Sequence, residues 1–467
     1  MASAQPITKR PLSLFERYAL ACDETGHPMA IAHVVSYTTP PPLDELHDRV
    51  RVAQARLPLL RSVITGAYSS KPAFAVRAQA FEPTEIVHVH SHEGTAGEME
   101  MDAMDVLRAE LRLMRTRKVD AHAPLWRIGL YPRFVAVTCN HVVADGMGSL
   151  ALLAAMTAGR EDPRSVYALA EEDGAHTSYD ETVMLWAGLG MLARTLWREL
   201  IVPALPLAIQ RWATSSEPWP GVCASPLGSE WAILGASVDA DTLTRLSAVG
   251  KQKGVRTLHP LIDTAYTAAV WAVFNADERF HFIANTPRSD RKPELGHSAI
   301  TGLYTTLFLR DHGLGASDDL WEIARDSAAF LLSPSAGADA RRTVSMLRFV
   351  PGTTKSGTTG MMQYLTDRAS CPSPFFEGVM VSNLGRFTLP PGATDHVWGQ
   401  ACHPSSFAIG ANVVGHAGGL RLTTVFWEGV PADNAQVARV HRIWERLVGL
   451  MADGVEGTVG ELTQKCM

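Results

Sequence analysis

The chain of 467 residues carries little charge, because Asp, Glu, Lys and Arg make up only 19% of it and the formal net charge is −6. No segment concentrates lysine and arginine, whereas a protein that depends on nucleic acid usually contains a basic domain. We therefore expect no nucleic-acid partner. The apolar share of 46%, together with the length, is typical of a globular protein of two or three domains.

Cysteines are few and scattered. The sequence has six, and no two of them form a CxxC pair, so the signatures of zinc sites and thioredoxin-type redox sites are missing. Six cysteines in a chain of this length do not suggest a disulfide framework. The first residues, "MASAQPITKRPLSLFERYAL", contain no apolar core of a secretory signal. We therefore expect a reduced, cytoplasmic monomer without a bound metal or cofactor.

The longest apolar stretch, residues 183–212, is interrupted by charges and prolines. The interrupting residues are Arg194, Arg198, Glu199, Pro203 and Pro206. A spanning helix needs about 20 mostly apolar residues, so the pattern predicts an amphipathic surface helix over 183–202 and a broken second one. Packing on the core or over an entrance is the first interpretation. The tryptophans at 186, 197 and 212 also suit peripheral contact with an intracellular membrane, which is the second.

Hydrophobic periodicity predicts an α/β fold. Apolar spacing indicates helices over 43–57 and 101–116, and two β-rich runs on either side of Pro132 indicate a hairpin. The alternation restarts near residue 229 and closes with a helix over 434–451. We therefore predict two domains of comparable size with mixed sheets flanked by helices. The predicted units are an N-terminal domain over 1–180, a crossover over 181–228 and a C-terminal domain over 229–467.

The segment "CNHVVADGMG", residues 139–148, has the composition of a functional site. Strand alternation places Val135, Val137 and His141 on one face and Asn140 on the other. Imidazole can take and return a proton near neutral pH, which makes His141 a candidate general base. A buried structural histidine followed by an Asp-capped turn explains these residues equally well.

These residues carry a resemblance that covers most of the chain. "HVVADG" matches the HxxxDG motif of the CoA-dependent acyltransferase superfamily, which includes chloramphenicol acetyltransferases, plant acyltransferases and condensation domains of peptide synthetases. Further segments agree in order and spacing: "PLSLFERY", "RLPLLRSVI", "APLWRIGL", "TLHPLIDTAYTAAV", "PRSDRKPELG" and "VSNLGRF". The chain looks most similar to fungal alcohol O-acetyltransferases. The DFGWG motif of the plant branch is absent.

The resemblance implies two chloramphenicol-acetyltransferase-like domains with an active-site tunnel between them. It implies that His141 removes a proton from the acceptor, which attacks an acyl thioester directly without a serine nucleophile. The partners would be acyl-CoA, with acetyl-CoA as the expected co-substrate, and a small or lipophilic alcohol. A condensation-type enzyme that uses a carrier-bound donor is the alternative. A non-enzymatic binding protein is the third hypothesis, and the intact HxxxDG motif counts against it.

The same resemblance assigns roles to further residues. Asp145 is expected to be structural and to pair with Arg288, and Gly146 to allow the tight turn. Ser382 and Asn383 are candidates for the tunnel wall and the oxyanion site, although a turn at a strand end also explains them. Most members have two histidines, HHxxxDG, whereas this chain has Asn140 in the first position. Any role that needs a second imidazole is therefore in doubt.

Three other patterns carry less weight. His88, His90 and His92 alternate along one predicted strand, but no later cluster completes a zinc site. The segment "GLGMLAR" lacks the βαβ frame of a dinucleotide site. In "GHSAITG" the second glycine comes too late for the nucleophile elbow of a serine hydrolase. We therefore predict helix packing for the second pattern and no serine hydrolase from the third.

Overall fold

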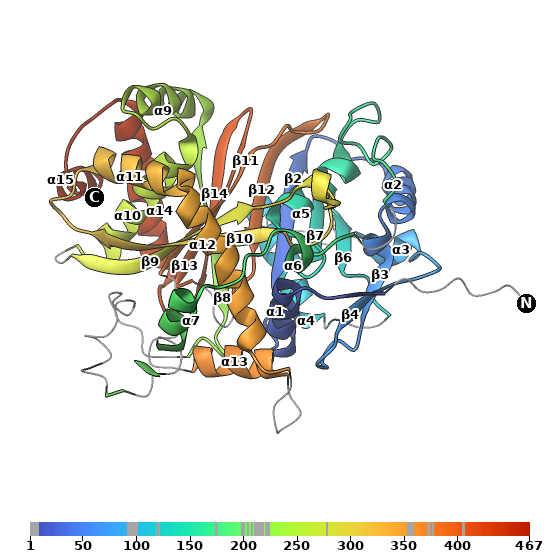
Figure 1. Cartoon of the computed structure of the whole chain (residues 1–467). Coiled ribbons are helices and arrows are strands. Elements are labelled where there is room, and N and C mark those ends of the chain that lie inside the picture. Colours follow the sequence, from blue (N-terminus) through green and yellow to red (C-terminus); the bar gives the residue numbers. More distant parts are fainter. Residues whose placement is uncertain are drawn as a thin grey trace, which may run out of the picture.

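Two sheet-rich lobes lie side by side in the computed structural model of the chain (Figure 1). The structure describes residues 9–90, 101–117, 119, 122–172, 176–197, 201–202, 205–206, 209, 219, 225–276, 279–352, 359–370, 375, 378–403 and 407–467. The N-terminal lobe contains a five-stranded sheet and a small three-stranded one, and the C-terminal lobe contains a six-stranded sheet. Helices flank both large sheets, so the predicted α/β class with two domains and mixed sheets is confirmed.

The strands alternate with helices along the chain. The strands are β1 (Lys9–Pro11), β2 (Ala30–Tyr37), β3 (Ser62–Thr65), β4 (Ala73–Val76), β5 (Val87–Val89), β6 (Trp126–Leu130), β7 (Phe134–Asn140), β8 (Trp231–Asp239), β9 (Phe280–Ser289), β10 (Thr305–Leu314), β11 (Val379–Arg386), β12 (Ala393–Gln400), β13 (Ile409–His416) and β14 (Gly419–Trp427). The hairpin predicted around Pro132 is the antiparallel pair of β6 and β7.

The predicted helices over 43–57, 101–116 and 434–451 are α2, α4 and α14. The α-helices are α1 (Leu14–Glu24), α2 (Leu43–Arg56), α3 (Pro83–Ile86), α4 (Ala103–Thr116), α5 (Gly146–Thr157), α6 (Tyr179–Thr182), α7 (Leu189–Leu196), α9 (Ala240–Gln252), α10 (Leu258–Phe274), α11 (Leu320–Leu332), α12 (Pro334–Ser345), α13 (Gly360–Ala369), α14 (Asn434–Ala452) and α15 (Val459–Cys466). Short 3-10 helices are η1 (Pro58–Arg61), η4 (Pro293–Leu295) and η5 (Met346–Phe349).

The C-terminal half of the chain contributes one strand, called here the exchanged strand, to the N-terminal sheet. The N-terminal sheet has the order β12-β2-β7-β6-β5, and its edge strand β12 comes from the C-terminal half of the chain. The other large sheet has the order β10-β9-β11-β13-β14-β8 and mixes parallel and antiparallel pairs. Because β12 pairs with β2, the sheet of the first lobe is complete only when residues from 229–467 join it. The sequential boundaries at residues 180 and 229 remain a prediction.

Strand alternation decides which core each side chain of β7 enters. Val135, Val137 and Cys139 belong to the core beneath α5, whereas Ala136 belongs to the core shared with α4 and the C-terminal lobe. This is the division that the period of two predicts for a strand covered on both faces. His141, two residues after Cys139, therefore leaves the strand on the α5 side.

Buried imidazoles connect the exchanged strand to α5. His33 Nδ1 lies 3.2 Å from His396 Nε2 of β12, and His33 Nε2 lies 2.9 Å from Ser149 Oγ. Ser149 Oγ donates to the Gly146 carbonyl at 3.0 Å, so it accepts from His33, and His33 Nδ1 in turn accepts from His396. Burial lowers the pKa of His396 to about 3, and the charge of His416 adds to that effect. The chain of neutral rings thus joins β12 to the first turn of α5.

The helix in the apolar stretch after residue 182 begins later than its periodicity indicates. A surface helix is present as α7 (Leu189–Leu196), none of whose residues is buried, and residues 198–200 lie outside the described part of the chain. Gly188 is the N-cap, which explains why the apolar residues before it are not helical. The second helix predicted near Trp212 lies largely outside the described residues. Among the described helices none is long and apolar enough to cross a membrane.

Candidate active site

His141 directly follows β7, at the edge of the N-terminal sheet. Its backbone N–H donates to the Met29 carbonyl at 2.8 Å, which extends the ladder with β2 by one residue. The side chain is buried, with 8% of the residue exposed. Burial lowers the pKa of His141 below its usual value of 6.5, while the Asp145 carboxylate and the residue's own backbone act in the opposite direction. The imidazole is therefore neutral at pH 7 and able to accept a proton.

Asp145 is the N-cap of α5, and its carboxylate is bound by backbone N–H groups. Its Oδ1 accepts from Gly148 N at 2.8 Å, and its Oδ2 accepts from Tyr304 N at 2.9 Å. Burial alone would raise the pKa of this carboxyl, but the charge of Arg291 and these backbone hydrogen bonds outweigh it and lower the pKa. Hydrogen bonds donated to both oxygens favour the ionised form of a carboxyl group, so Asp145 is negatively charged at neutral pH.

The partner of Asp145 is Arg291, and the prediction of Arg288 is wrong. Arg291 Nη2 donates to Asp145 Oδ1 at 2.7 Å, with only 10% of the Arg291 side chain exposed. Strand β9 continues through Ser289, so Arg288 still belongs to the strand. Its Nε lies 3.7 Å from Asp290 Oδ1, and 44% of its side chain is exposed. The chain turns only after β9 ends at Ser289. This turn brings Arg291, the second arginine of "PRSDR", to the loop that carries Asp145.

Arg291 also organises the segment that it comes from. Its guanidinium donates to the carbonyls of Ser298, Thr301 and Gly302. The Gly302 N–H donates to the Val143 carbonyl at 2.7 Å, so the two segments also join through their backbones. The loop that carries His141 is thereby held by residues that lie about 150 positions later in the chain.

Gly148, rather than Gly146, is the glycine that this close approach requires. A Cβ atom at Gly148 would lie 2.2 Å from the Ile300 carbonyl oxygen and 2.8 Å from Arg291 Nη2. At Gly146 the nearest atom would be Leu384 Cδ2 at 3.0 Å, the end of a side chain. Backbone atoms cannot move aside as a leucine methyl group can. The spacing of Asp145 and Gly148 is thus needed for docking between the lobes, and Gly146 borders the cavity described next.

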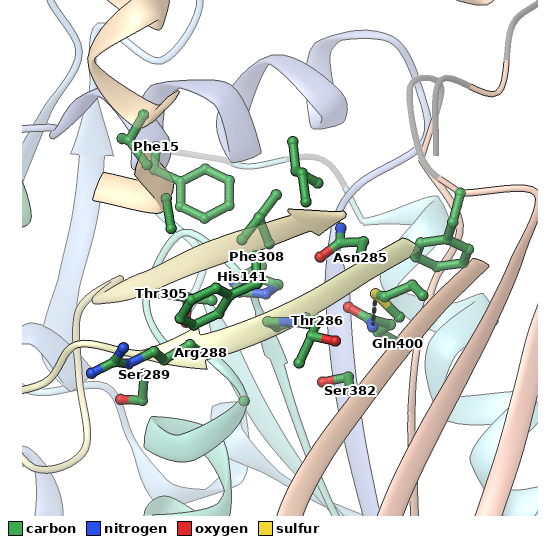
Figure 2. Close-up of a pocket in the computed structure, with 18 of the residues that line it drawn as sticks. Phe15, His141, Asn285, Thr286, Arg288, Ser289, Thr305, Phe308, Ser382 and Gln400 are labelled. Carbon is green, nitrogen blue, oxygen red and sulfur yellow. Dashed lines mark hydrogen bonds between the residues drawn. The ribbon is translucent and has the colours of Figure 1, made fainter. Parts of the chain in front are cut away.

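His141 opens into a cavity of about 680 Å³ between the two lobes (Figure 2). Residues of α1, β9, β10, α12, β11 and β12 line it, so both halves of the chain contribute. One part of the wall is apolar and includes Phe15, Tyr18, Leu307, Phe308, Leu332 and Val344. Another part is polar and includes Asn285, Thr286, Arg288, Ser289, Ser382 and Gln400. The volume and mixed lining suit a small molecule with apolar and polar groups.

The structure brings Ser382 and Asn383 to this cavity. Both line it from β11, the parallel neighbour of β9, which carries Arg288. Asn383 also has the turn role that its sequence allows, because its Oδ1 accepts from Gly385 N at 2.8 Å and Gly385 has φ +75°. The amide group of Asn383 is thus partly used by the backbone, while Ser382 Oγ remains the simpler candidate donor to a ligand.

Asn140 has a structural role. Its Oδ1 accepts from Val142 N at 3.0 Å and caps the turn after β7. Two other imidazoles line the cavity with His141, those of His259 in α10 and of His403, which follows β12. The sequence around His403, "ACHPSS", carries no motif that would single this histidine out. Only the pairing of β12 with β2 shows that it reaches the cavity.

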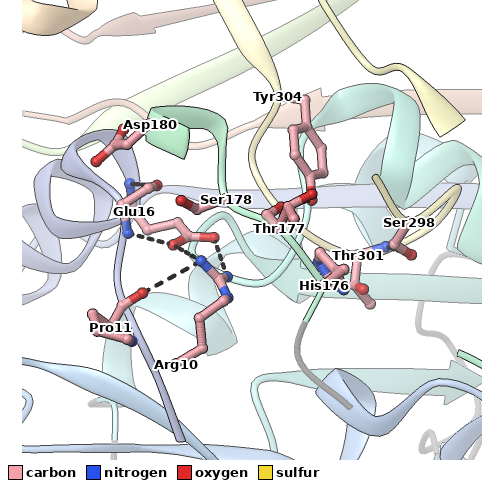
Figure 3. A network of polar contacts seen from close by, with 12 residues as sticks. Arg10, Pro11, Glu16, His176, Thr177, Ser178, Asp180, Ser298, Thr301 and Tyr304 are labelled. Atoms are coloured by element: carbon pink, nitrogen blue, oxygen red, sulfur yellow. Dashed lines mark hydrogen bonds and ion pairs between the residues drawn. The ribbon is translucent and has the colours of Figure 1, made fainter. Parts of the chain in front are cut away.

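The N-terminal helix is fixed to the same centre by a second ion pair. Arg10 binds both carboxylate oxygens of Glu16, at 2.7 and 3.0 Å, and Glu16 also accepts from Ser13 N (Figure 3). Nearby, Tyr304 OH donates to the Thr177 carbonyl at 2.6 Å. Leu14 N of α1 donates to Asp180 Oδ2 at 2.8 Å, and the backbone of Tyr304 binds Asp145. The segment 177–180 therefore connects α1, which carries Phe15 and Tyr18 into the cavity, to the loop that carries His141.

The patterns set aside in the sequence have local roles. His90 stacks on Tyr131, with ring centroids 4.2 Å apart, and lies 3.8 Å from Glu110. His92 lies outside the described residues. Ser298 of "GHSAITG" accepts from the backbone N–H groups of Ile300 and Thr301, as a turn residue does.

We predict that removing one partner of the Asp145–Arg291 pair destabilises the fold. Asp145→Asn and Arg291→Met should each lower the free energy of unfolding by about 3–5 kcal/mol, because the surviving charge is left buried and uncompensated. The double variant should lose much less than the sum of the two. Denaturant unfolding of the four proteins measures the coupling directly.

Arg288→Met is the matched control for that cycle. It removes the neighbouring arginine from the same strand end, and since that side chain is 44% exposed we expect a change within about 0.5 kcal/mol. Strict additivity of Asp145→Asn and Arg291→Met, or equal damage by Arg288→Met, would contradict the assignment of Arg291.

Comparisons with known proteins show the fold but no close relative. No family model matches the chain, and no curated protein matches its sequence. Among solved structures, it is similar to the condensation domain from the Monacolin K polyketide synthase MokA, with a TM-score of 0.61, 12% identity and coverage of 97% of this chain and 99% of that one.

Two further structures show the same likeness. The epimerization domain from the third module of tyrocidine synthetase B has a TM-score of 0.60 and 13% identity, with 99% of each chain covered. Polyketide synthase associated protein 5 from Mycobacterium tuberculosis has a TM-score of 0.59 and 14% identity, covering 96% of this chain and 100% of that one. The chain thus has the two-lobed fold of condensation domains, which confirms the predicted fold class.

Proposed function

We propose that the protein is an acyltransferase that moves an acyl group from a thioester directly to an acceptor hydroxyl, with His141 as the general base. The observation that carries the proposal is a buried, neutral imidazole that opens into a cavity shared by two lobes. Its loop is fixed by a separate ion pair, so the neighbouring carboxylate does not need to carry protons.

The steps follow from the residues present. His141 takes the proton as the acceptor oxygen attacks the thioester carbonyl, and the carbonyl oxygen becomes an anion. Ser382 Oγ and the backbone N–H groups at the start of α5 are the nearby groups suited to stabilise that anion. When the carbon–sulfur bond breaks, the imidazolium returns its proton to the thiolate. An ester and a free thiol leave, and His141 is neutral again.

Acetyl-CoA and a small or lipophilic alcohol are the substrates we propose. The apolar wall around Phe15, Leu307 and Phe308 supports a lipophilic group, and Arg288 near the strand end offers a positive charge to a phosphate. The similar structures include domains of a peptide synthetase and of a polyketide synthase, which supports a carrier-bound donor as the second candidate. Mass spectrometry of products from acetyl-CoA and from an acetylated carrier protein, each with a panel of alcohols, distinguishes the two donors. Absence of an acyl product from both donors would contradict the proposed function.

We predict that His141→Ala keeps the fold and loses about 10²–10⁴-fold in rate, because a positioned base contributes that much. In the unmodified protein the rate should rise with pH and reach its plateau through an ionisation below pH 6.5, since burial lowers the pKa of His141 and the neutral ring is the active form. Initial rates across pH measure both effects.

His90→Ala is the matched control, because His90 lies on Tyr131 outside the cavity. It should keep the rate. A folded His141→Ala protein with full activity, or a rate that still rises well above pH 6.5, would show that another group is the base.

We also predict a ternary complex rather than an acyl-enzyme. The two cysteines closest to the site in the chain, Cys139 and Cys402, are buried. Burial raises the pKa of Cys139 to about 12 and raises that of Cys402 well above its usual value. Such thiols are poor nucleophiles. Double-reciprocal lines should intersect when donor and acceptor are both varied, whereas parallel lines would indicate a covalent intermediate.

Peripheral membrane contact belongs to the same proposal. Leu189 and Trp186 are 85% and 67% exposed, and the Trp186 ring lies 4.1 Å from the Arg348 guanidinium. Ala187 N donates to Ser345 Oγ, which places this surface beside the end of α12 that borders the cavity. An acceptor dissolved in a membrane would then be close to the site.

We predict that the protein floats with vesicles of mixed neutral and anionic lipid, and that Leu189→Ser together with Trp186→Ser reduces the bound fraction several-fold. Trp side chains at such a surface suit the headgroup region. Flotation that is absent, or unchanged by the two substitutions, would contradict membrane contact through this surface.

A further inference from the structure

The strand register brings a second histidine to His141. Strand β2 lies between β7 and β12 and is antiparallel to both, so β7 and β12 end at the same edge of the sheet. His141 N donates to the Met29 carbonyl, and Ala401 N donates to the Ala30 carbonyl, from the two sides of β2. Strands two apart are separated by about 10 Å. The segments that carry His141 and His403 therefore leave the sheet as near neighbours.

Both imidazoles border the same cavity. His403 lines it together with His141 and packs edge-on against Tyr18 of α1, with ring centroids 5.9 Å apart. Its Nδ1 is buried and, within the described part of the chain, has no hydrogen-bond partner. Burial, together with the charges that His141 and His27 would carry, lowers the pKa of His403 to about 3. His403 is thus a neutral ring.

The neutral state limits what His403 can do. With so low a pKa it does not carry a proton at neutral pH, so its contribution is a hydrogen bond. An unpaired buried acceptor is tolerated better than an unpaired buried N–H. The hydrogen therefore belongs on Nε2, and Nδ1 keeps its lone pair. Nε2–H is then a donor available to the cavity, whereas Asn140, in the usual position of a second histidine, is bound to the turn backbone.

We propose that His403 is a further catalytic residue, whose Nε2–H binds the acceptor oxygen and aims the hydroxyl hydrogen at His141. The proposal rests on the proposed function, because it needs an acceptor hydroxyl between the two rings. The acceptor oxygen accepts one hydrogen bond from His403 and donates its own hydrogen to His141. When His141 takes that proton, the oxygen forms its bond to the carbonyl carbon, and His403 keeps its hydrogen throughout.

The arrangement has a consequence for the two domains. His141 follows a strand of the N-terminal half, whereas His403 follows β12, which the C-terminal half supplies to the same sheet. Strand β12 therefore both connects the lobes and brings His403 near His141.

Substitution of His403 by leucine and by glutamine tests the role. Leucine removes the donor and should lower kcat by about 10²-fold, the usual loss for one preorganised donor. Glutamine places an amide N–H near the position of Nε2 and should recover at least part of that loss. The acid limb of the pH–rate profile should stay where it is, because His141 remains the base. His27→Gln is the control, since His27 is a neighbouring buried histidine packed on Trp427 and should leave kcat unchanged.

A second measurement does not depend on turnover. In histidine-labelled protein, the imidazole NMR signals of His141 should shift in His403→Gln and remain in place in His27→Gln. If the parent enzyme transfers acyl groups and His403→Leu keeps full kcat, the role of His403 is overturned while the proposed function stands.

If the parent transfers nothing, the proposed function fails, and with it the role of His403 in holding an acceptor hydroxyl. The NMR result then bears on the geometry alone. Unchanged His141 signals in His403→Gln would show that the rings do not face one another, which overturns the proposal independently. Equal rates for the leucine and glutamine variants, both reduced, would mean a packing role and also overturn it.

Discussion

The buried pair of Asp145 and Arg291 holds the rest of the site in place. It joins the loop after β7 to the segment after β9, and it is the interaction on which the position of His141 depends. Asp145 accepts three hydrogen bonds, from Arg291 and from the backbone of Gly148 and Tyr304, so its position is fixed in three directions. A pair so well enclosed is costly to break on one side. This explains why an aspartate can lie four residues from the proposed base without a part in the proposed chemistry.

The exchanged strand provides a second constraint. β12 completes the N-terminal sheet, and the buried chain from His396 through His33 and Ser149 joins it to the first turn of α5. The first turn of α5 begins directly after Asp145, so β12 and the ion pair fix the same loop from two sides. Preorganisation of this kind keeps the reacting groups in place before the substrates arrive. The proposed part of His403 extends the same arrangement to the acceptor.

The two halves of the chain supply different parts of the cavity wall. The N-terminal lobe supplies His141 and the aromatic residues of α1, while the C-terminal half supplies polar side chains from β9 and β11 and apolar ones from β10 and α12. The contrast between Gly146 and Gly148 shows how closely the lobes meet, since only at Gly148 would a Cβ strike backbone from the other half of the chain. A cavity built in this way needs both halves folded together, as does the proposed direct transfer between two bound substrates.

The sequence by itself determined the local features: the strand that ends at His141, the two faces of β7, the cap at Asp145, and the helices α2, α4 and α14. These follow from periods of two and 3.6 and from turn chemistry, which act within a few residues. The tertiary structure decided which arginine meets Asp145, where α7 begins, and which other imidazoles border the cavity. Arg288 and Arg291 are three residues apart in one motif, and only the point at which β9 stops selects between them. Likewise, His403 comes to His141 through the pairing of β12 with β2, a contact between residues more than 350 positions apart, and no local pattern encodes such a pairing.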